Sequence, residues 1–336
     1  GHGPGSAGAG AVGPRAVPND PSWSQLYGMQ RLDAPTAWNT QTGSANVVVA
    51  VIDTGIDRDH SDLAGNIWVN TDEVAGNGVD DDGNGFIDDR YGWDFADGDN
   101  DPHAIDGGGG HSHGTHCAGT VGAVGNNGVG VVGVCWDVSL MSVRVLNADG
   151  SGDYFGVSEG IVYAADNGAD VLSMSLGGGY AASMQSAIDH AWAQDCVICC
   201  AMGNENSYIS ESGGWVSPVC NDGVPGVDNK ILGVAATDSS DRRAYFSNYS
   251  DAYAFCDVSA PGVNILSTVM SNGYESYSGT SMATPHVAGL AALLRAQFPA
   301  DNNARIMARI RAGANSIDGV NSGYEGLLGT GRINAN

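Results

Sequence analysis

The stretch Ser278-Gly279-Thr280-Ser281-Met282-Ala283-Thr284-Pro285-His286-Val287-Ala288-Gly289 decides how the rest of the chain is interpreted. Small residues come first and an apolar run from Val287 to Leu294 follows, which predicts that a helix begins close to Ser281. Free backbone N–H groups and the positive end of the helix dipole favour negative charge there. A serine at that position can attack a carbonyl group while its own N–H binds the oxyanion that forms. A helix cap or a tight packing turn would explain the same residues, since Ser and Thr are favoured at helix starts.

Two stretches upstream favour the catalytic interpretation. The apolar run over residues 47–52 ends in Asp53 and a glycine turn, which is typical of a buried parallel strand with the acid at its carboxyl end, where open α/β sheets place their sites. Residues 111–121 form a glycine-rich loop that leads into a helix of small residues and carries three histidines: His111, His113 and His116. Short His spacing also allows a zinc interpretation, but the helical His-Glu-x-x-His arrangement is absent. On position alone, His113 and His116 are equal candidates for a general base.

These three blocks resemble the signature blocks of the subtilisin-like serine proteases, the subtilases. The matching motifs are Asp-Thr-Gly-Ile-Asp at 53–57, His-Gly-Thr-His-Cys-Ala-Gly at 113–119 and Gly-Thr-Ser-Met-Ala-Thr-Pro-His-Val-Ala-Gly at 279–289. Their order along the chain, Asp then His then Ser, is that of the subtilisin triad. The resemblance, which runs from about Pro18 to the C-terminus, implies a serine endopeptidase with Asp53, His113 and Ser281 as its triad and an acyl-enzyme intermediate.

The resemblance extends to the oxyanion site and the substrate clamp. In Ala201-Met202-Gly203-Asn204 it implies that the Asn204 side chain donates to the oxyanion, whereas an asparagine in a turn is the simpler interpretation of this residue by itself. It also implies that two glycine-rich edges hold the substrate as an extended strand, which predicts broad specificity for flexible polypeptides. Ordinary flexible loops are the alternative. The predicted substrate-binding residues are Gly150, Ser151, Gly152, Ser175, Leu176 and Gly177.

An acidic segment, residues 80–89, has the spacing of a calcium loop. Acids or amides occupy its first, third and fifth places, a glycine the sixth and an acid the ninth, which matches most of the EF-hand pattern. The bidentate Glu of the twelfth place is missing, because Tyr91 stands there, and a solvated acidic turn is the alternative. The predicted ligands are Asp80, Asp82, Asn84, Phe86, Asp88 and Asp89. A second calcium site, implied by the resemblance alone, involves Asp62 and Asn127.

Composition limits the possible partners. The chain has 336 residues with 13 basic and 38 acidic side chains, a net charge of −25. Nucleic acids and anionic membranes bind basic surfaces, so neither is expected as a partner. No apolar run is long enough to cross a membrane, and no segment has the pattern of a signal peptide. Because subtilases are usually made with a signal and an inhibitory prosegment, we expect a mature, extracellular, monomeric form.

The rest of the chain alternates strands and helices, which predicts one α/β domain over residues 18–336 with a largely parallel central sheet flanked by helices. Residues 1–17 are expected to form a flexible tail or a processing remnant. Further strands are predicted over 138–146, 171–176, 197–201, 231–237 and 251–259. Helices are predicted over 158–168, with a Ser cap, over 183–195 and from Asn303 onward.

The seven cysteines cannot all pair within the chain. Cys220 and Cys256 lie in looser segments and form the expected disulfide, while buried reduced thiols are the alternative for every cysteine. Two other function classes remain open at this point. One is a catalytically inactive relative that binds calcium, although all four catalytic positions carry competent residue types. The other is an α/β-hydrolase esterase, which the Gly-x-Ser-x-Ala context of Ser281 disfavours.

Overall fold

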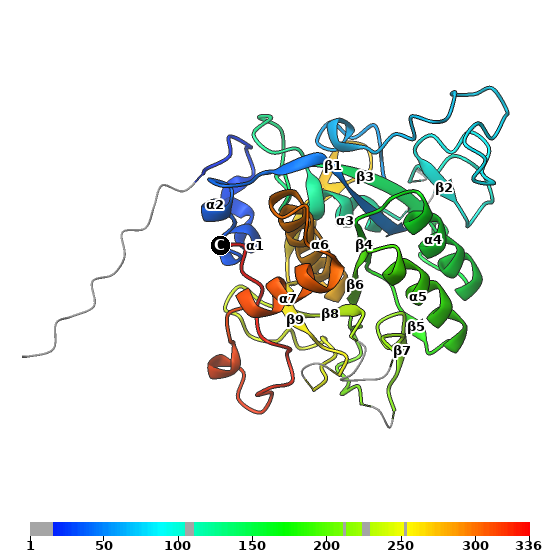
Figure 1. Ribbon diagram of the computed structural model, residues 1–336. Helices are drawn as coiled ribbons and strands as arrows, with labels where there is room; N and C mark the ends of the chain where they lie inside the picture. Colours follow the sequence, from blue (N-terminus) through cyan, green and yellow to red (C-terminus); the bar gives the residue numbers. More distant parts are fainter. Residues whose placement is uncertain (1–15, 105–110, 211–212, 224–228, 252–253) are drawn as a thin grey trace, which may run out of the picture.

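A seven-stranded sheet forms the centre of the protein, in the order β2-β3-β1-β4-β6-β8-β9 (Figure 1). The structure is a computed structural model that describes residues 16–104, 111–210, 213–223, 229–251 and 254–336. All neighbouring strands of this sheet are parallel, and helices cover both faces. The predicted α/β class with a largely parallel sheet is therefore confirmed. Residues 1–15 of the predicted tail lie outside the described residues.

The strands of the central sheet and the main helices follow the predicted alternation. The sheet consists of β1 (Gly43–Asp53), β2 (Gly92–Asp94), β3 (Asp137–Arg144), β4 (Val171–Met174), β6 (Val197–Ala201), β8 (Ile231–Thr237) and β9 (Val258–Pro261). Two small antiparallel pairs join β5 (Gly178–Gly179) to β7 (Val216–Ser217) and β10 (Ile265–Val269) to β11 (Gly273–Tyr277). The helices are α1 (Tyr27–Arg31), α2 (Ala34–Ala37), α3 (His113–Gly122), α4 (Tyr154–Asp166), α5 (Gln185–Ala193), α6 (Thr280–Gln297) and α7 (Asn303–Gly313).

Strand β1 lies between two apolar cores, because successive side chains of a strand point to opposite faces of the sheet. Val49 and Val51 pack into the core formed with α3 and α6, and Ala50 and Ile52 into the core formed with α4 and α5. This explains why the β1 sequence is a continuous apolar run instead of an alternating one. After β1 the chain adds β2 and β3 on one side of it, and then β4, β6, β8 and β9 on the other side. The order in which strands are added therefore reverses at β1.

Helix α6 crosses the centre of one core and is buried on almost every side. Its small residues allow close packing against its neighbours. At Gly289 a Cβ would lie 2.7 Å from the Val134 side chain and 3.0 Å from the Val121 carbonyl oxygen. A larger residue at this position would push α6 away from α3 and displace the serine at its start.

Two predicted boundaries are wrong. Helix α4 begins at Tyr154 and not at 158 with a Ser cap, because the Asp153 carboxylate accepts hydrogen bonds from the N–H groups of Phe155 and Gly156. Asp is a strong N-cap, so the helix starts one turn earlier. Of the strand predicted over 251–259, residues 252–253 lie outside the described residues, and in the rest the structure forms only the four-residue β9, which starts at Val258 and ends at Pro261.

The predicted disulfide is also wrong, since all seven cysteines are free and buried. Cys220 Sγ accepts a hydrogen bond from the Val216 N–H, and Cys256 Sγ contacts the Val258 carbonyl oxygen. Burial is the main factor that raises the pKa of the Cys220 thiol to about 11, and burial also raises that of Cys256. These thiols behave as small apolar core residues.

We therefore expect seven thiols to react with an alkylating reagent when the protein is denatured without a reductant, as counted by intact-mass spectrometry. A sample reduced before alkylation serves as the control and should carry the same number of labels. An increase of two labels after reduction would contradict this prediction.

Candidate active site

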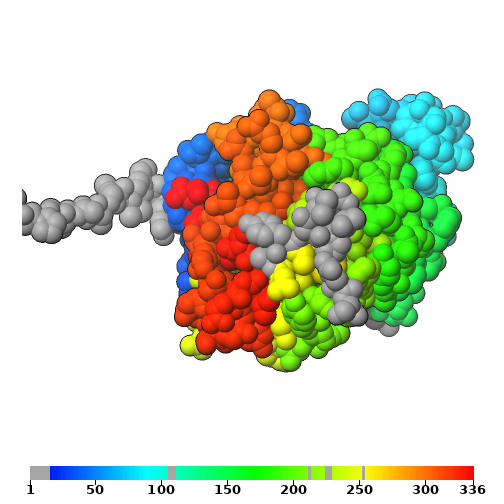
Figure 2. Space-filling model, turned by 60° about the horizontal axis from the view of Figure 1, so that its bottom comes forward, coloured from blue at the N-terminus to red at the C-terminus, as the bar shows by residue number. Residues whose placement is uncertain are grey.

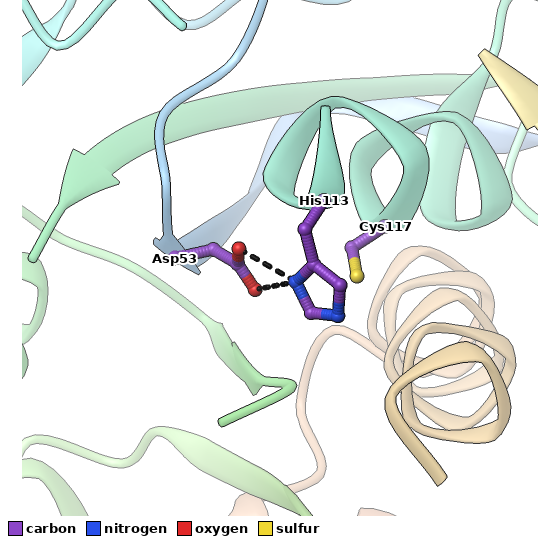
Figure 3. A group of neighbouring side chains, drawn as sticks. All are labelled: Asp53, His113 and Cys117. Atoms are coloured by element: carbon purple, nitrogen blue, oxygen red, sulfur yellow. Dashed lines mark hydrogen bonds and ion pairs between the residues drawn. The ribbon is translucent and has the colours of Figure 1, made fainter. Parts of the chain in front are cut away.

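Asp53 and His113 meet where β1 ends and α3 begins. The His113 Nδ1 lies 2.8 Å from Oδ1 and 2.9 Å from Oδ2 of Asp53 (Figure 3). Asp53 is completely buried, and its Oδ1 also accepts a hydrogen bond of 2.8 Å from the Thr54 N–H. The contact fixes the imidazole so that its Nε2 lies on the side away from Asp53 (Figure 3).

The Asp53 carboxylate also changes the acidity of the imidazole. Burial disfavours the charged imidazolium, but the negative charge and the hydrogen bond of Asp53 outweigh it, so the pKa of His113 is raised above its usual 6.5. The imidazole is therefore a stronger base than a free histidine, and it becomes fully neutral only at a pH above the raised pKa.

Ser281 is the second residue of α6, where the first backbone N–H groups have no acceptor within the helix. Its hydroxyl donates to the Ser175 carbonyl oxygen at 3.1 Å, and the Ser175 hydroxyl donates to the Ser281 carbonyl oxygen at 2.8 Å. These two bonds attach the start of α6 to the end of β4. The Ser281 hydroxyl must turn from Ser175 to His113 before it can pass on its proton.

Asn204 follows the carboxyl end of β6 and is held by the residue before Ser281. Its Oδ1 accepts hydrogen bonds from the Thr280 N–H at 2.9 Å and the Thr280 hydroxyl at 3.1 Å. With the carbonyl end of the amide occupied in this way, its NH₂ group is left for an acceptor in the cavity that Asn204 shares with Ser281. An uncharged NH₂ donor at this place can bind a developing oxyanion.

Two adjoining cavities of about 510 and 490 Å³ flank these residues and share the segment from Ser175 to Gly178. His113 lines the first cavity and Ser281 the second. All six predicted substrate-binding residues line the first cavity, so the structure brings the two predicted edges together. At Gly152 a Cβ would lie 2.4 Å from the Val145 carbonyl oxygen, so this edge of the cavity requires a glycine.

Three further side chains complete these walls. Glu205 and Trp215 line the second cavity, and Tyr154 lines the first. The Tyr154 hydroxyl lies 3.1 Å from the place a Cβ would take at Gly178. The Glu205 carboxylate adds negative charge to the second cavity. In the sequence, only its position directly after Asn204 connects it with the site.

Cys117, one turn after His113 on α3, lies beside the imidazole (Figure 3). Its Sγ contacts the Ser281 carbonyl oxygen at 3.5 Å. Burial raises the pKa of this thiol well above the ordinary value, and the nearby Asp53 charge adds to the effect. The thiol therefore stays protonated and is a poor nucleophile.

The other two histidines of the motif have different surroundings. His116 Nε2 contacts the carbonyl oxygens of Ile265 and Glu275, and its ring stacks on Tyr277 with 4.4 Å between centroids. Burial is the main reason that its pKa falls to about 4, so it stays neutral. His111 lies at the rim of the first cavity with its ring 5.6 Å from that of His113. The geometry thus separates His113 from His116, which spacing alone did not.

The acidic loop projects from the body beside α4, as the cyan lobe in Figure 2 shows. Its carboxylates do not all converge. Asp82 and Asp89 form a cluster with Glu73, an upstream residue that the sequence did not predict, with ligand atoms within 4.8 Å of one another. The other predicted residues shape the loop: Asp80 accepts from the N–H groups of Gly83, Asn84 and Gly85, Asn84 Oδ1 from that of Phe86, and Asp88 from those of Asn77 and Gly78.

Asp62 and Asn127 also lie together. The Asn127 Nδ2 donates to Asp62 Oδ1 at 2.8 Å, and the Val131 N–H donates to Asp62 Oδ2 at 2.8 Å. Burial raises the pKa of Asp62. A third acid, Asp20, accepts hydrogen bonds from the N–H groups of Asn126 and Asn127, so it joins the same loop.

Known proteins resemble this chain over nearly its whole length. Residues 44–331 match the sequence pattern of the subtilase family. The chain is 39% identical to thermitase of Thermoactinomyces vulgaris over 321 residues, which cover 95% of this chain and 98% of thermitase. It is 38% identical to subtilisin E of Bacillus subtilis over 301 residues, 89% of this chain and 68% of that protein. A solved protease structure from Pseudoalteromonas arctica superimposes with a TM-score of 0.75 at 33% identity, covering 95% of this chain and 98% of that one. The chain is therefore a member of the subtilase family and a serine endopeptidase.

Proposed function

We propose that this endopeptidase cleaves flexible polypeptides through a triad of Asp53, His113 and Ser281. The observation that carries the proposal is the paired contact of His113 Nδ1 with the buried Asp53 carboxylate, at the edge of a cavity that adjoins the one lined by Ser281. In this mechanism Ser281 Oγ attacks the scissile carbonyl and His113 takes its proton, then returns it to the leaving amine. Asp53 holds the imidazole and stabilises its charged form. Water then hydrolyses the acyl-enzyme by the same route.

The oxyanion of each tetrahedral intermediate binds to the Asn204 NH₂ group and the Ser281 N–H. Both donors are fixed before the substrate arrives, because Thr280 holds the Asn204 amide and Ser281 lies in the first turn of α6. Preorganised donors stabilise the transition state without the cost of reorienting solvent.

Broad specificity is part of the proposal. The glycines of the two edges, Gly150–Gly152 and Ser175–Gly177, present backbone groups to a substrate backbone, which every peptide shares. The cavities on either side are wide enough for side chains of several kinds, and their walls combine apolar residues such as Leu176 with the Glu205 carboxylate. We also propose that the enzyme is monomeric, that it acts outside the cell, and that residues 18–336 form one peptidase domain. The described residues include no helix with the length and apolar character of a membrane span.

Calcium is proposed as a stabilising ion at Glu73, Asp82 and Asp89. Glu73 and Asp89 are buried, and within the described residues no arginine or lysine forms an ion pair with any of the three carboxylates. Close, buried like charges destabilise a fold unless a cation lies between them, and hard oxygen donors of this kind suit calcium. The Asn70 Nδ2 donates hydrogen bonds to Asp82 and Asp89, and the Asn84 Nδ2 donates to Asp89, so neutral N–H donors are the side-chain partners of these carboxylates on this side. Asp62, Asn127 and Asp20 form the second proposed site.

The first prediction concerns the nucleophile. A fluorophosphonate probe should add one label to the enzyme and none to the Ser281→Ala variant, because only a serine beside a general base is reactive. Intact-mass spectrometry measures the label, and Ser278→Ala, three residues earlier, should be labelled like the parent. Labelling of Ser281→Ala would assign the nucleophile to another residue.

The second prediction concerns pH. In the parent, kcat/KM should fall on the acid side around a pKa above 6.5, because His113 must be neutral to accept the proton and Asp53 raises its pKa. Asp53→Asn removes the negative charge, so the acid limb should move to lower pH, while kcat at neutral pH falls by about 10⁴-fold. A profile measured with a peptide substrate from pH 5 to 9 checks both effects. An acid limb that stays in place in Asp53→Asn would disprove the electrostatic role of Asp53.

The third prediction concerns calcium. Calcium at about 100 times its Kd should raise the melting temperature by about 5 °C relative to chelated enzyme, because an ion that binds only the folded state stabilises it. Differential scanning calorimetry of Asp82→Ala should show a smaller gain. Asp72→Asn, an exposed acid next to Glu73 but outside the cluster, should show the full gain. Equal gains in Asp82→Ala and the parent would refute this site.

A further inference from the structure

A buried amide, the side chain of Asn248, lies behind the loop that carries Asn204. Asn248 follows β8 in the chain, and only 1% of its surface is exposed. Among the described residues its side chain makes four hydrogen bonds, and all four go to the segment 202–207. No step of the proposed mechanism uses this residue.

The four bonds use the full capacity of the amide. Oδ1 accepts from the N–H groups of Ser207 at 2.9 Å and Glu205 at 3.1 Å. Nδ2 donates to the Met202 carbonyl oxygen at 2.9 Å and to the Glu205 carboxylate at 2.6 Å. An amide has two acceptor sites and two donor hydrogens, so all four are paired. With donors at one end and acceptors at the other, the amide has a single favourable orientation.

These partners enclose Asn204. Met202 lies two residues before it and Glu205 directly after it, so the Asn248 side chain ties the loop together on both sides of the oxyanion donor. The loop itself has no regular secondary structure, and it contains backbone angles of φ +96° at Gly203 and +53° at Asn206. A segment of this kind makes few hydrogen bonds of its own and needs an external partner to keep one conformation.

The Asn248 side chain packs directly against the backbone of this loop. A Cβ at Gly203 would lie 2.6 Å from Asn248 Nδ2, so the loop backbone and the amide are in direct contact. The Asn248 N–H also donates to the Gly203 carbonyl oxygen at 3.0 Å. At the other end of the site, Thr280 holds the Asn204 Oδ1. The Asn204 NH₂ group is therefore held between α6 and Asn248, and the loop is further held at Asn206 by the Phe246 carbonyl oxygen and the Arg243 side chain.

We propose that Asn248 is a positioning residue of the peptidase reaction: it holds the segment 202–207 so that the Asn204 NH₂ group faces the oxyanion. The same amide holds the Glu205 carboxylate against the wall of the second cavity. The proposal rests on the proposed role of Asn204 as oxyanion donor. A donor shifted from its place binds the oxyanion less well, whereas substrate binding through the glycine edges is unaffected.

A double-mutant cycle tests this. Asn248→Ala should lower kcat by about 10-fold and leave KM within about two-fold, because the oxyanion exists only in the transition state. Asn204→Ala should lower kcat by about 10²–10³-fold, the general value for removal of one oxyanion donor in subtilisin-type sites. With Asn204 already removed, adding Asn248→Ala should change kcat by less than about two-fold, because the oxyanion donor that Asn248 positions is already absent. Each kcat is divided by the concentration of active sites found by fluorophosphonate titration.

Two further variants separate positioning from stability. Asn248→Asp has nearly the same shape but replaces both donors with an acceptor that faces the Glu205 carboxylate, so kcat should fall at least as far as in Asn248→Ala. Asn303→Ala removes another buried amide, which donates to the carbonyl oxygens of Trp192 in α5 and of Cys196 just before β6, far from the oxyanion donor. This variant should have a lower melting temperature and an unchanged kcat per active site.

The outcomes are distinct. The proposal would be overturned if Asn248→Ala lowered kcat by the same factor in the parent and in the Asn204→Ala variant. A parental kcat in Asn248→Ala would overturn it as well. Loss of titratable active sites in both Asn248 variants would assign the residue to folding and likewise overturn it. A parental kcat in Asn204→Ala would instead disprove the proposed oxyanion donor.

Discussion

The site depends on the buried negative charge of the Asp53 carboxylate. Asp53 has no exposed surface, and burial of a carboxylate is costly unless hydrogen bonds and a positive partner compensate it. Here the Thr54 N–H and the His113 imidazole supply that compensation. The same contact that makes the charge tolerable raises the basicity of His113, so the stability of the buried acid and the reactivity of the imidazole have one cause.

The sheet explains why this contact forms. Because β1, β4 and β6 are parallel neighbours, their carboxyl ends lie at one edge, and each end is followed by a residue of the site: Asp53 at the end of β1, Ser175 after β4 and Asn204 after β6. Helices α3 and α6 enter from one face and bring His113 and Ser281 to that edge. Parallel strands need crossover connections, which explains why residues far apart in the chain meet there.

Rigid elements alone do not complete the site. The segment 202–207 and the two glycine edges have no helix or long strand to hold them, and side chains from elsewhere give them a fixed conformation. Thr280 and Asn248 hold the Asn204 loop from opposite sides. The acidic loop, in turn, packs on α4 through Phe86 and Tyr163 and through the hydrogen bond from the Tyr163 hydroxyl to Asp89. This contact connects the proposed ion site with the helix that begins at Tyr154, in the wall of the first cavity.

The sequence by itself determined the parallel α/β class, the family and the four catalytic candidates, because apolar runs, glycine turns and the three motifs are local features of the chain. It did not determine the start of α4, where the stronger Asp153 cap lies one turn before the Ser that the pattern favoured. It predicted a disulfide between Cys220 and Cys256, whereas the packed core keeps both as thiols. It left His113 and His116 equivalent until the resemblance was considered, and the structure distinguishes them by their partners, a carboxylate for one and backbone carbonyl groups for the other. Glu73 and Asn248 escaped notice for the same reason. Their partners come from other segments of the chain, and contacts of that kind exist only after the chain has folded.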